Sequence, residues 1–246
     1  MSLKHNNVLA NQHINTLAYN SKMKRSEINS ILVDAKKFMA EKCFVLPPWA
    51  YWSVSDWKEN LSGTAEIRNN FLGWDITDFG SGDFKSRGLF LFTIRNGKLG
   101  KDRKPYAEKI MIVEESQETP MHFHWSKMED IINRGGGNLV IELYNSKSDD
   151  SLDVTSIHFK TDGIERKVEA GGKVILKPGE SITLEQGMFH RFYGEAGKGK
   201  VLVGEVSAVN DDASDNCFLE EIGRFPVIEE DEQPLHLLVG DYENFL

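Results

Sequence analysis

Short apolar runs alternate with turn residues from about residue 89 to the end of the chain. These runs are rich in β-branched and aromatic residues and are separated by Gly, Pro, Asn and Asp, a pattern typical of an all-β barrel or sandwich. The pattern predicts strands at residues 89–95, 109–114, 120–125, 139–144, 156–160, 174–176, 181–184, 190–193 and 201–206. Asn96-Gly97 predicts a hairpin turn and Pro178-Gly179 predicts another turn.

The first third of the chain has a different pattern. Apolar residues between positions 26 and 42 recur every three or four residues, which predicts an amphipathic helix with Ser26 as N-cap, ended by Pro47 and Pro48. The segment that follows is rich in Trp and turn-prone residues, and only one short helix near Asp56 is expected in it. We therefore predict a helical and irregular N-terminal extension at residues 1–87, packed on a barrel with a C-terminal tail at residues 88–246.

Composition narrows the class of protein and its partners. A net charge of −9 without a dense block of Lys and Arg argues against binding to nucleic acid. Cys43 and Cys217 are too few for a disulfide framework or a Cys-type zinc site, which favours a reducing compartment. The N-terminal residues lack the apolar length of a signal peptide or a membrane span. We expect a soluble, cytoplasmic protein whose partners are small molecules or other proteins.

Candidate metal ligands lie in the stretch PMHFHWSKMEDIINRGGG, residues 120–137. His122 and His124 are two residues apart in an apolar run, so on a strand both imidazoles point to the same face. Glu129 follows five residues later, beyond a short turn. Imidazole nitrogens with one carboxylate suit Mn, Fe, Co, Ni or Zn. The alternative is that these are ordinary barrel and surface residues.

A second block, GESITLEQGMFHRFYG at residues 179–194, completes a resemblance to the cupin signature. The matching positions are His122, His124, Glu129 and Gly136 in the first block, and Gly179, Gly187 and His190 in the second. The departures are Ser116, Glu185 and Gly194, none of them at a ligand position. The resemblance implies a mainly β cupin fold, a double-stranded β-helix or jelly-roll barrel, in which His122, His124, Glu129 and His190 bind one metal ion.

A closer resemblance is to the D-lyxose isomerase family of cupin-type sugar isomerases. It is carried by HFHWSKMEDIINRGGG, by GMFHRF and by EVSAVNDDASDNCFLEEIGRFPVIEEDE, and it covers about residues 88–234. The resemblance implies a Mn²⁺-type metal, with Zn²⁺, Co²⁺, Ni²⁺ or Fe²⁺ as alternatives. It also implies a free pentose or hexose as substrate and a homodimer.

Aldose–ketose isomerisation moves a hydrogen between C1 and C2, either as a proton through an enediol or as a hydride. The proton route needs a base and an acid beside that edge of the sugar. Lys127, on the turn before Glu129, is the expected acid. The family resemblance implies that Glu220 in the FLEE stretch is the base, with Glu221 as its rival. Arg224 is expected to bind a sugar hydroxyl or to pair with the acidic tail.

The leading hypothesis is a metal-dependent isomerase that interconverts D-lyxose and D-xylulose, and also D-mannose and D-fructose. A cupin oxygenase would use a similar ligand set with Fe(II), but it has no need of Lys127 and Glu220. A non-enzymatic sugar-binding barrel has no need of four converging ligands. A phospho-sugar isomerase requires a Lys and Arg cluster for the phosphate, and the sequence shows no clear one.

Overall fold

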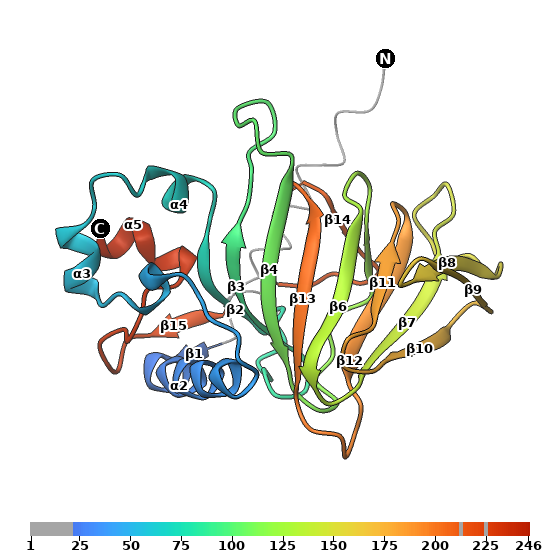
Figure 1. Ribbon diagram of the computed structural model, residues 1–246, viewed down its shortest axis with the longest axis horizontal. Helices are drawn as coiled ribbons and strands as arrows, with labels where there is room; N and C mark the ends of the chain where they lie inside the picture. Colours follow the sequence, from blue (N-terminus) through green and yellow to red (C-terminus); the bar gives the residue numbers. More distant parts are fainter. Residues whose placement is uncertain (1–21, 212–213, 224–225) are drawn as a thin grey trace.

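Two β-sheets around a shared core form the central part of the fold (Figure 1). The computed structural model describes residues 22–211, 214–223 and 226–246. Within these residues the larger sheet has eight strands, in the spatial order β2 (Gly73–Thr77), β3 (Leu89–Arg95), β4 (Tyr106–Val113), β13 (Val201–Ala208), β6 (Glu129–Gly136), β11 (Ser181–Leu184), β8 (Ile157–Thr161) and β9 (Ile164–Val168). The smaller sheet has five, in the order β10 (Gly172–Leu176), β7 (Leu139–Asn145), β12 (Met188–Gly194), β5 (His122–His124) and β14 (Asn216–Phe218).

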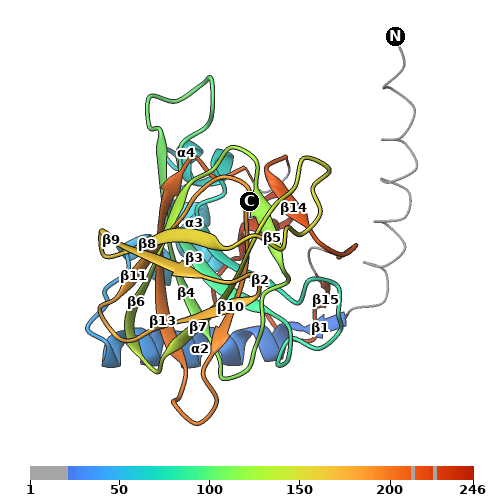
Figure 2. The same ribbon diagram turned by 90° about the vertical axis from the view of Figure 1, so that its right-hand side faces the viewer.

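Apolar side chains from both sheets meet in the barrel core. Leu139, Ile141 and Leu143 alternate along β7 and are fully buried. They belong to one cluster with Ile131 and Ile182 of the larger sheet. Each buried aliphatic side chain contributes about 1.5–3 kcal/mol to the free energy of folding. Figure 2 looks at the barrel from the end formed by β8, β9 and β10. The predicted mainly β barrel is confirmed.

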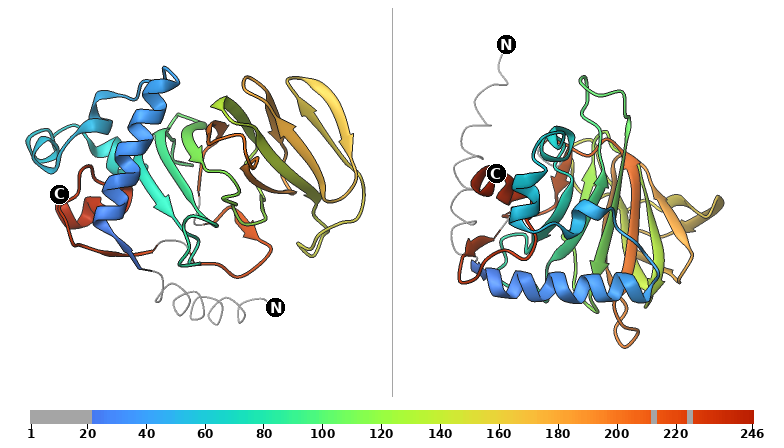
Figure 3. Two further views of the ribbon diagram at one scale, coloured as in Figure 1. Left: turned by 90° about the horizontal axis from the view of Figure 1, so that it is seen from below. Right: turned by 60° about the vertical axis from the view of Figure 1, so that its left-hand side comes forward.

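A second core lies on the outer face of the larger sheet, beneath the helix α2 (Arg25–Glu41). Ile28, Leu32 and Ala35 of α2 have the predicted spacing, and they belong to the same buried cluster as Phe90 and Phe92 of β3. Figure 3 shows α2 lying along one side of the sheet. The predicted helix is confirmed.

The ends of α2 differ from the prediction. Lys24 is the N-cap residue, while the Ser26 hydroxyl instead donates a 2.8 Å hydrogen bond to Asp231 of the C-terminal tail. The helix ends at Glu41, before the two prolines, because Cys43 adopts a left-handed φ of 55° that a helix does not accommodate. Contacts with the distant tail, which the helix sequence does not reveal, therefore set its start.

The nine predicted strands all occur, each within three residues of its predicted ends. The predicted strands do not include β6. Gly135 and Gly136 lie at its end with φ values of 142° and 98°, next to a register shift in β13. The prediction also missed β2, β9 and β14, as well as β1 (Lys22–Lys24) and β15 (Val227–Glu229). These strands are short or have few apolar residues, so pairing with neighbours decides their structure.

The two expected turns have different outcomes. Pro178-Gly179 does join β10 to β11, with Gly179 at a φ of 97°. Asn96-Gly97 does not form a two-residue hairpin turn, because residues 96–105 connect β3 to β4. The buried Asn96 side chain is bonded to the backbone of Asn210, accepting its N–H and donating to its carbonyl, both at 3.0 Å. This long-range contact fixes the start of the loop.

The N-terminal and C-terminal parts of the described chain pack together at one end of the barrel. Here lie α3 (Val54–Glu59), the short helix predicted near Asp56, and α4 (Ala65–Asn69), η2 (Val239–Asp241) and α5 (Tyr242–Phe245) (Figure 1). β1 pairs in parallel with β15, and the fully buried Arg25 guanidinium binds Asp241 at 2.8 Å and Glu230 at 2.6 Å. β2, from the predicted extension, pairs with β3 within the larger sheet. The division at residue 87 remains a prediction.

The described chain contains no helix of the length and apolarity needed to cross a membrane.

Lys36 and His236 form a pH-sensitive contact between α2 and the C-terminal tail. Nδ1 of His236 lies 3.0 Å from the Trp52 carbonyl oxygen, and its Nε2 lies 2.7 Å from Lys36 Nζ. The carbonyl accepts the Nδ1 proton, so Nε2 accepts from the Lys36 ammonium. Burial lowers the pKa of His236, and the Lys36 charge lowers it further. The folded protein therefore holds His236 neutral.

The His236→Gln substitution is expected to make stability less sensitive to acid. In the unfolded chain His236 takes up a proton near pH 6.5, whereas in the folded protein it does so only at lower pH. The contribution of His236 to the free energy of unfolding is therefore present above about pH 6.5 and is lost as the pH falls below that value. Denaturant unfolding at several pH values between 5 and 7 measures this effect. The difference in unfolding free energy between wild type and variant should shrink as the pH falls. A difference that stays constant would show that His236 does not make stability sensitive to acid. His158→Gln, at an exposed histidine, is the matched control.

Candidate metal centre and active site

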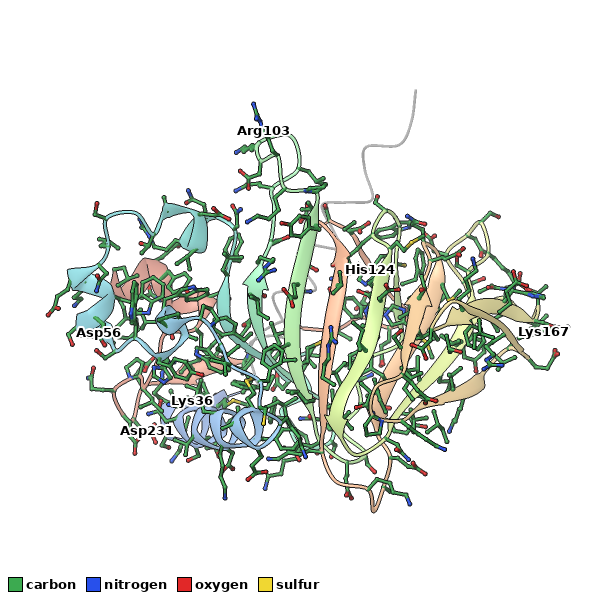
Figure 4. The ribbon with its side chains drawn as sticks, viewed as in Figure 1. Lys36, Asp56, Arg103, His124, Lys167 and Asp231 are labelled. Atoms are coloured by element: carbon green, nitrogen blue, oxygen red, sulfur yellow. The ribbon has the colours of Figure 1, made fainter. Side chains whose placement is uncertain are left out.

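Two neighbouring strands of the smaller sheet bring three histidines together. β5 and β12 are antiparallel, and His190 lies directly opposite His122 in their ladder. The period of two in β5 places His124 on the same face as His122. One ring nitrogen of each histidine lies within 4.8 Å of the other two. His124 and His190 are buried and His122 is partly exposed, and Figure 4 marks His124 within the barrel.

Backbone carbonyl groups orient all three rings. Nδ1 of His122 lies 2.9 Å from the Pro120 oxygen, Nδ1 of His124 lies 3.1 Å from the Asp215 oxygen, and Nδ1 of His190 lies 3.0 Å from the Met188 oxygen. A carbonyl oxygen only accepts, so in the neutral rings each Nδ1 carries the proton and each Nε2 presents a lone pair. This is the tautomer in which histidine binds a metal through Nε2.

Glu129, the first residue of β6, faces these nitrogens from the larger sheet. Its two carboxylate oxygens lie 3.1 Å from His190 Nε2 and 3.5 Å from His124 Nε2. His190 Nε2 is buried and forms no hydrogen bond of acceptable geometry among the described residues. Lone pairs that face a carboxylate at this distance favour a cation between them. The donor set of three imidazoles and one carboxylate therefore fits a divalent transition metal.

The protonation states suit metal binding. Burial lowers the pKa of His122 well below its ordinary value, and the neighbouring His190 and His124 lower it further. Burial alone would raise the pKa of Glu129, but the neighbouring ammonium of Lys127 brings it well below its usual range. A neutral imidazole and an ionised carboxylate are the forms that bind a metal.

Lys127 points inward, as expected, and belongs to a buried chain of charges. Its Nζ lies 2.7 Å from Glu129 Oε2 and 3.1 Å from Glu205 Oε1. Glu205 is only 5% exposed, and the same oxygen accepts from the Ser207 hydroxyl at 3.1 Å. Lys109 Nζ lies 3.2 Å from the same oxygen and 3.4 Å from Glu205 Oε2. A carboxylate and two ammonium groups thus adjoin the candidate metal centre, away from bulk water.

The sequence analysis missed Glu205 and Lys109. Glu205 lies in VLVGEVSA at the same strand parity as Val203 and Ser207, which are both buried. A carboxylate at an inward position of a barrel strand is a signal of function, because burying an unpaired charge is costly. Its pairing with Lys127, 78 residues away, depends on the register of β6 and β13.

The structure does not place Glu220 among the buried groups. Its side chain is 53% exposed and forms an ion pair with Arg87. Glu221 is also exposed, and Arg224 lies outside the described residues. Phe218, two residues before Glu220, does reach the centre, since its ring stacks on His122 at 5.2 Å and an interplanar angle of 26°.

A cavity of about 880 Å³ lies beside the centre but is not lined by its histidines. Asp75, Thr93 and Lys109, from three adjacent strands, form part of its wall. Two residues of the cavity wall, Lys109 and Asn210, also contact the buried charges. Lys109 Nζ lies 3.2 Å from Glu205, and Asn210 Oδ1 lies 3.3 Å from Lys127 Nζ. The candidate metal ligands and the buried charges converge at the histidine cluster and not in this cavity.

The model of the D-lyxose isomerase family matches residues 23–242. The chain belongs to this family. Its relatives include the D-lyxose/D-mannose isomerases of Serratia proteamaculans and Escherichia coli O157:H7, which are 48% identical over 227 and 226 residues. Each alignment covers 91% of this chain and the whole of the relative. Family membership makes the chain an aldose–ketose sugar isomerase and confirms the predicted resemblance.

Solved structures of L-ribose isomerases share the fold of this protein. The enzyme of Cellulomonas parahominis has a TM-score of 0.58 and 16% identity, and the match covers 85% of this chain and 100% of that chain. The enzyme of Acinetobacter sp. DL28 has a TM-score of 0.57 and 14% identity, with 86% and 100% coverage. At these identities the likeness concerns the fold, and it agrees with the predicted cupin barrel. The cupin oxygenase and the non-enzymatic barrel are the less favoured alternatives.

Proposed function

We propose that the protein is a metal-dependent isomerase that interconverts D-lyxose and D-xylulose, and also D-mannose and D-fructose. The proposal rests on the position of Lys127 Nζ, which lies between Glu129 and Glu205 and beside three converging histidines. The names of the 48%-identical relatives support these two sugars as substrates. The net charge of −9 is consistent with a free sugar rather than a sugar phosphate.

His122, His124, His190 and Glu129 are the proposed metal ligands. Mn²⁺ is the proposed ion, with Zn²⁺, Co²⁺, Ni²⁺ and Fe²⁺ as competitors for the same nitrogen and oxygen donors. When bound, the ion would act as a Lewis acid on the sugar. The 2.7 Å contact between Lys127 Nζ and Glu129 supports the proposal of a proton donor at the edge of this site.

Lys127 and Glu205 are the proposed proton-transfer pair. In the direction from aldose to ketose, the Glu205 carboxylate takes the proton from C2 and returns it to C1. Lys127 donates a proton to the oxygen on C1 and recovers one from the hydroxyl on C2, so the enzyme ends in its starting state. The 3.1 Å contact between the two groups supports action on adjacent atoms. Glu220, Glu221 and a hydride route remain the alternatives.

Three further proposals concern groups and properties beyond the buried centre. We propose that Arg224 binds a sugar hydroxyl. We propose a homodimer, as the resemblance to the family implies. We also propose a cytoplasmic location, which is consistent with the two free cysteines, Cys43 and Cys217.

Turnover of sugars by metal-depleted and metal-restored protein tests the proposal. Chelator-treated protein is expected to lose the conversion of D-lyxose to D-xylulose, and Mn²⁺ should restore it more fully than Mg²⁺, which prefers all-oxygen ligands. D-Mannose should be converted under the same conditions, and sugar phosphates should not. Activity that survives complete metal removal would contradict the metal dependence. Absence of turnover with every free pentose and hexose would contradict the isomerase.

A further inference from the structure

A short segment from the end of the barrel sequence returns to the candidate metal centre. We call residues 214–220 the β14 segment. β14 pairs residue for residue with β5, placing Asn216 opposite His124 and Phe218 opposite His122. A backbone hydrogen bond of 2.9 Å from Leu219 N–H to the Met121 carbonyl continues this pairing. The segment therefore lies against the strand that carries two of the candidate ligands.

Asp215 in this segment orients His124 in a way that has no counterpart at the other two histidines. His122 and His190 each contact the carbonyl of the residue two positions earlier in their own chain segment, at 2.9 and 3.0 Å. Such local contacts form wherever the strand forms. The acceptor for His124 Nδ1 is instead the Asp215 carbonyl, 91 residues away and 3.1 Å distant. The orientation of His124 thus depends on docking of the β14 segment.

The Asp215 side chain holds a second part of the centre. One carboxylate oxygen accepts the Ser126 backbone N–H at 2.7 Å, and the other accepts the Lys127 backbone N–H at 2.8 Å. These two N–H groups lie in the turn between β5 and β6. Asp215 is only 8% exposed, so its carboxylate is largely withdrawn from water. Two short, charge-assisted hydrogen bonds fix the turn from which Lys127 reaches Glu129 and Glu205.

We propose that Asp215 is a positioning residue that aligns the metal ligand His124 with the proton-transferring Lys127. Its carbonyl sets the tautomer and direction of the ligand, and its carboxylate sets the turn that carries the ammonium group. The ligand part of this proposal stands on geometry alone, whereas the kinetic part rests on the proposed isomerase function. Neither depends on contact between Asp215 and the sugar.

Variants at Asp215 test the proposal in two independent ways. In Asp215→Ala, kcat for D-lyxose is expected to fall about 10–100-fold while KM changes less than about threefold, because a supporting group rather than a substrate contact is lost. The affinity of the metal-free protein for Mn²⁺ should fall by up to about tenfold. Asp215→Asn should recover part of kcat, since its amide oxygen still accepts one N–H.

Nitrogen-15 NMR of the histidine rings in the metal-free protein separates positioning from general support. His124, His122 and His190 should all show the Nδ1–H tautomer in the wild type. Asp215→Ala keeps the backbone carbonyl but removes the carboxylate that holds the β14 segment against the turn. Looser docking of the segment should therefore make only His124 lose part of that population. Asp149→Ala is the matched control, because Asp149 also accepts a backbone N–H, from Ser151 at 3.2 Å, but in an exposed loop. It should leave kcat, metal affinity and all three ring signals unchanged.

Each outcome decides the proposal. Wild-type kcat, Mn²⁺ affinity and His124 signals in folded Asp215→Ala would overturn it. If Asp215→Ala does not fold, folded Asp215→Asn decides in its place: wild-type kcat overturns the proposal, and a reduced kcat with unchanged KM supports it. If the wild-type protein converts no sugar, the proposed isomerase fails, and the ring signals and metal affinity then decide the positioning of His124 alone.

Discussion

His190→Ala is expected to abolish stoichiometric Mn²⁺ binding and to reduce turnover of D-lyxose by about a thousandfold or more. His190 is 1% exposed, and its Nε2 faces Glu129 at 3.1 Å. Loss of a Lewis acid removes several kcal/mol of transition-state stabilisation, and each 1.4 kcal/mol is about tenfold in rate. Metal analysis of the purified variant and titration calorimetry measure the binding, and a coupled assay for the ketose measures turnover.

His122→Ala should give the same result, because His122 lies opposite His190 in the ladder. His158→Ala, at an exposed histidine on β8, is the control and should keep both metal binding and turnover. The variants should also remain folded, since removing a neutral imidazole leaves no unpaired buried charge of its own. Normal turnover in either His190→Ala or His122→Ala would exclude the histidine cluster as the metal centre.

Glu205→Gln is expected to lower kcat about 10²–10⁴-fold while leaving the metal bound, because general-base catalysis typically contributes a factor of that size. Glutamine keeps the shape of the side chain but does not accept the C2 proton. The direct measurement is exchange of deuterium at C2 of D-[2-²H]lyxose with solvent, which should stop in this variant. Metal content should remain at the wild-type level, since no metal ligand is changed.

Glu220→Gln is the decisive comparison, because the sequence alone favoured Glu220 as the base. Its half-exposed ion pair with Arg87 contributes only about 0–1 kcal/mol, so turnover of this variant should stay within about threefold of the wild type. If C2 exchange stops in Glu220→Gln and continues in Glu205→Gln, the assignment of the base to Glu205 is wrong. A melting curve for each variant separates lost chemistry from lost folding, since Glu205→Gln leaves two buried lysines less compensated.

The candidate metal ligands could be predicted because their signals are local. The His-x-His spacing needs only the period of a strand, and the second block carries His190 at a fixed distance from Gly187. Pairing of β5 with β12 then places His190 opposite His122. Local patterns of this kind also predicted the helix α2 and the nine strands.

The remaining groups of the site were not predictable because their partners come from the tertiary fold. Glu205 is a single acidic residue in an apolar strand, and only the register of β13 against β6 brings it to Lys127. Asp215 lies 88 residues from the Lys127 N–H that it accepts. The FLEE stretch was assigned to catalysis through family resemblance, yet in the structure Phe218 is the part of it that reaches His122.

X-ray diffraction at the manganese absorption edge, from crystals grown with Mn²⁺, locates the bound ion. We expect one strong anomalous peak between the Nε2 atoms of His122, His124 and His190 and the Glu129 carboxylate, with Lys127 and Glu205 beside it. A peak among the acidic residues of the 880 Å³ cavity, with none at the histidines, would contradict the assigned metal centre and the chemistry built around it.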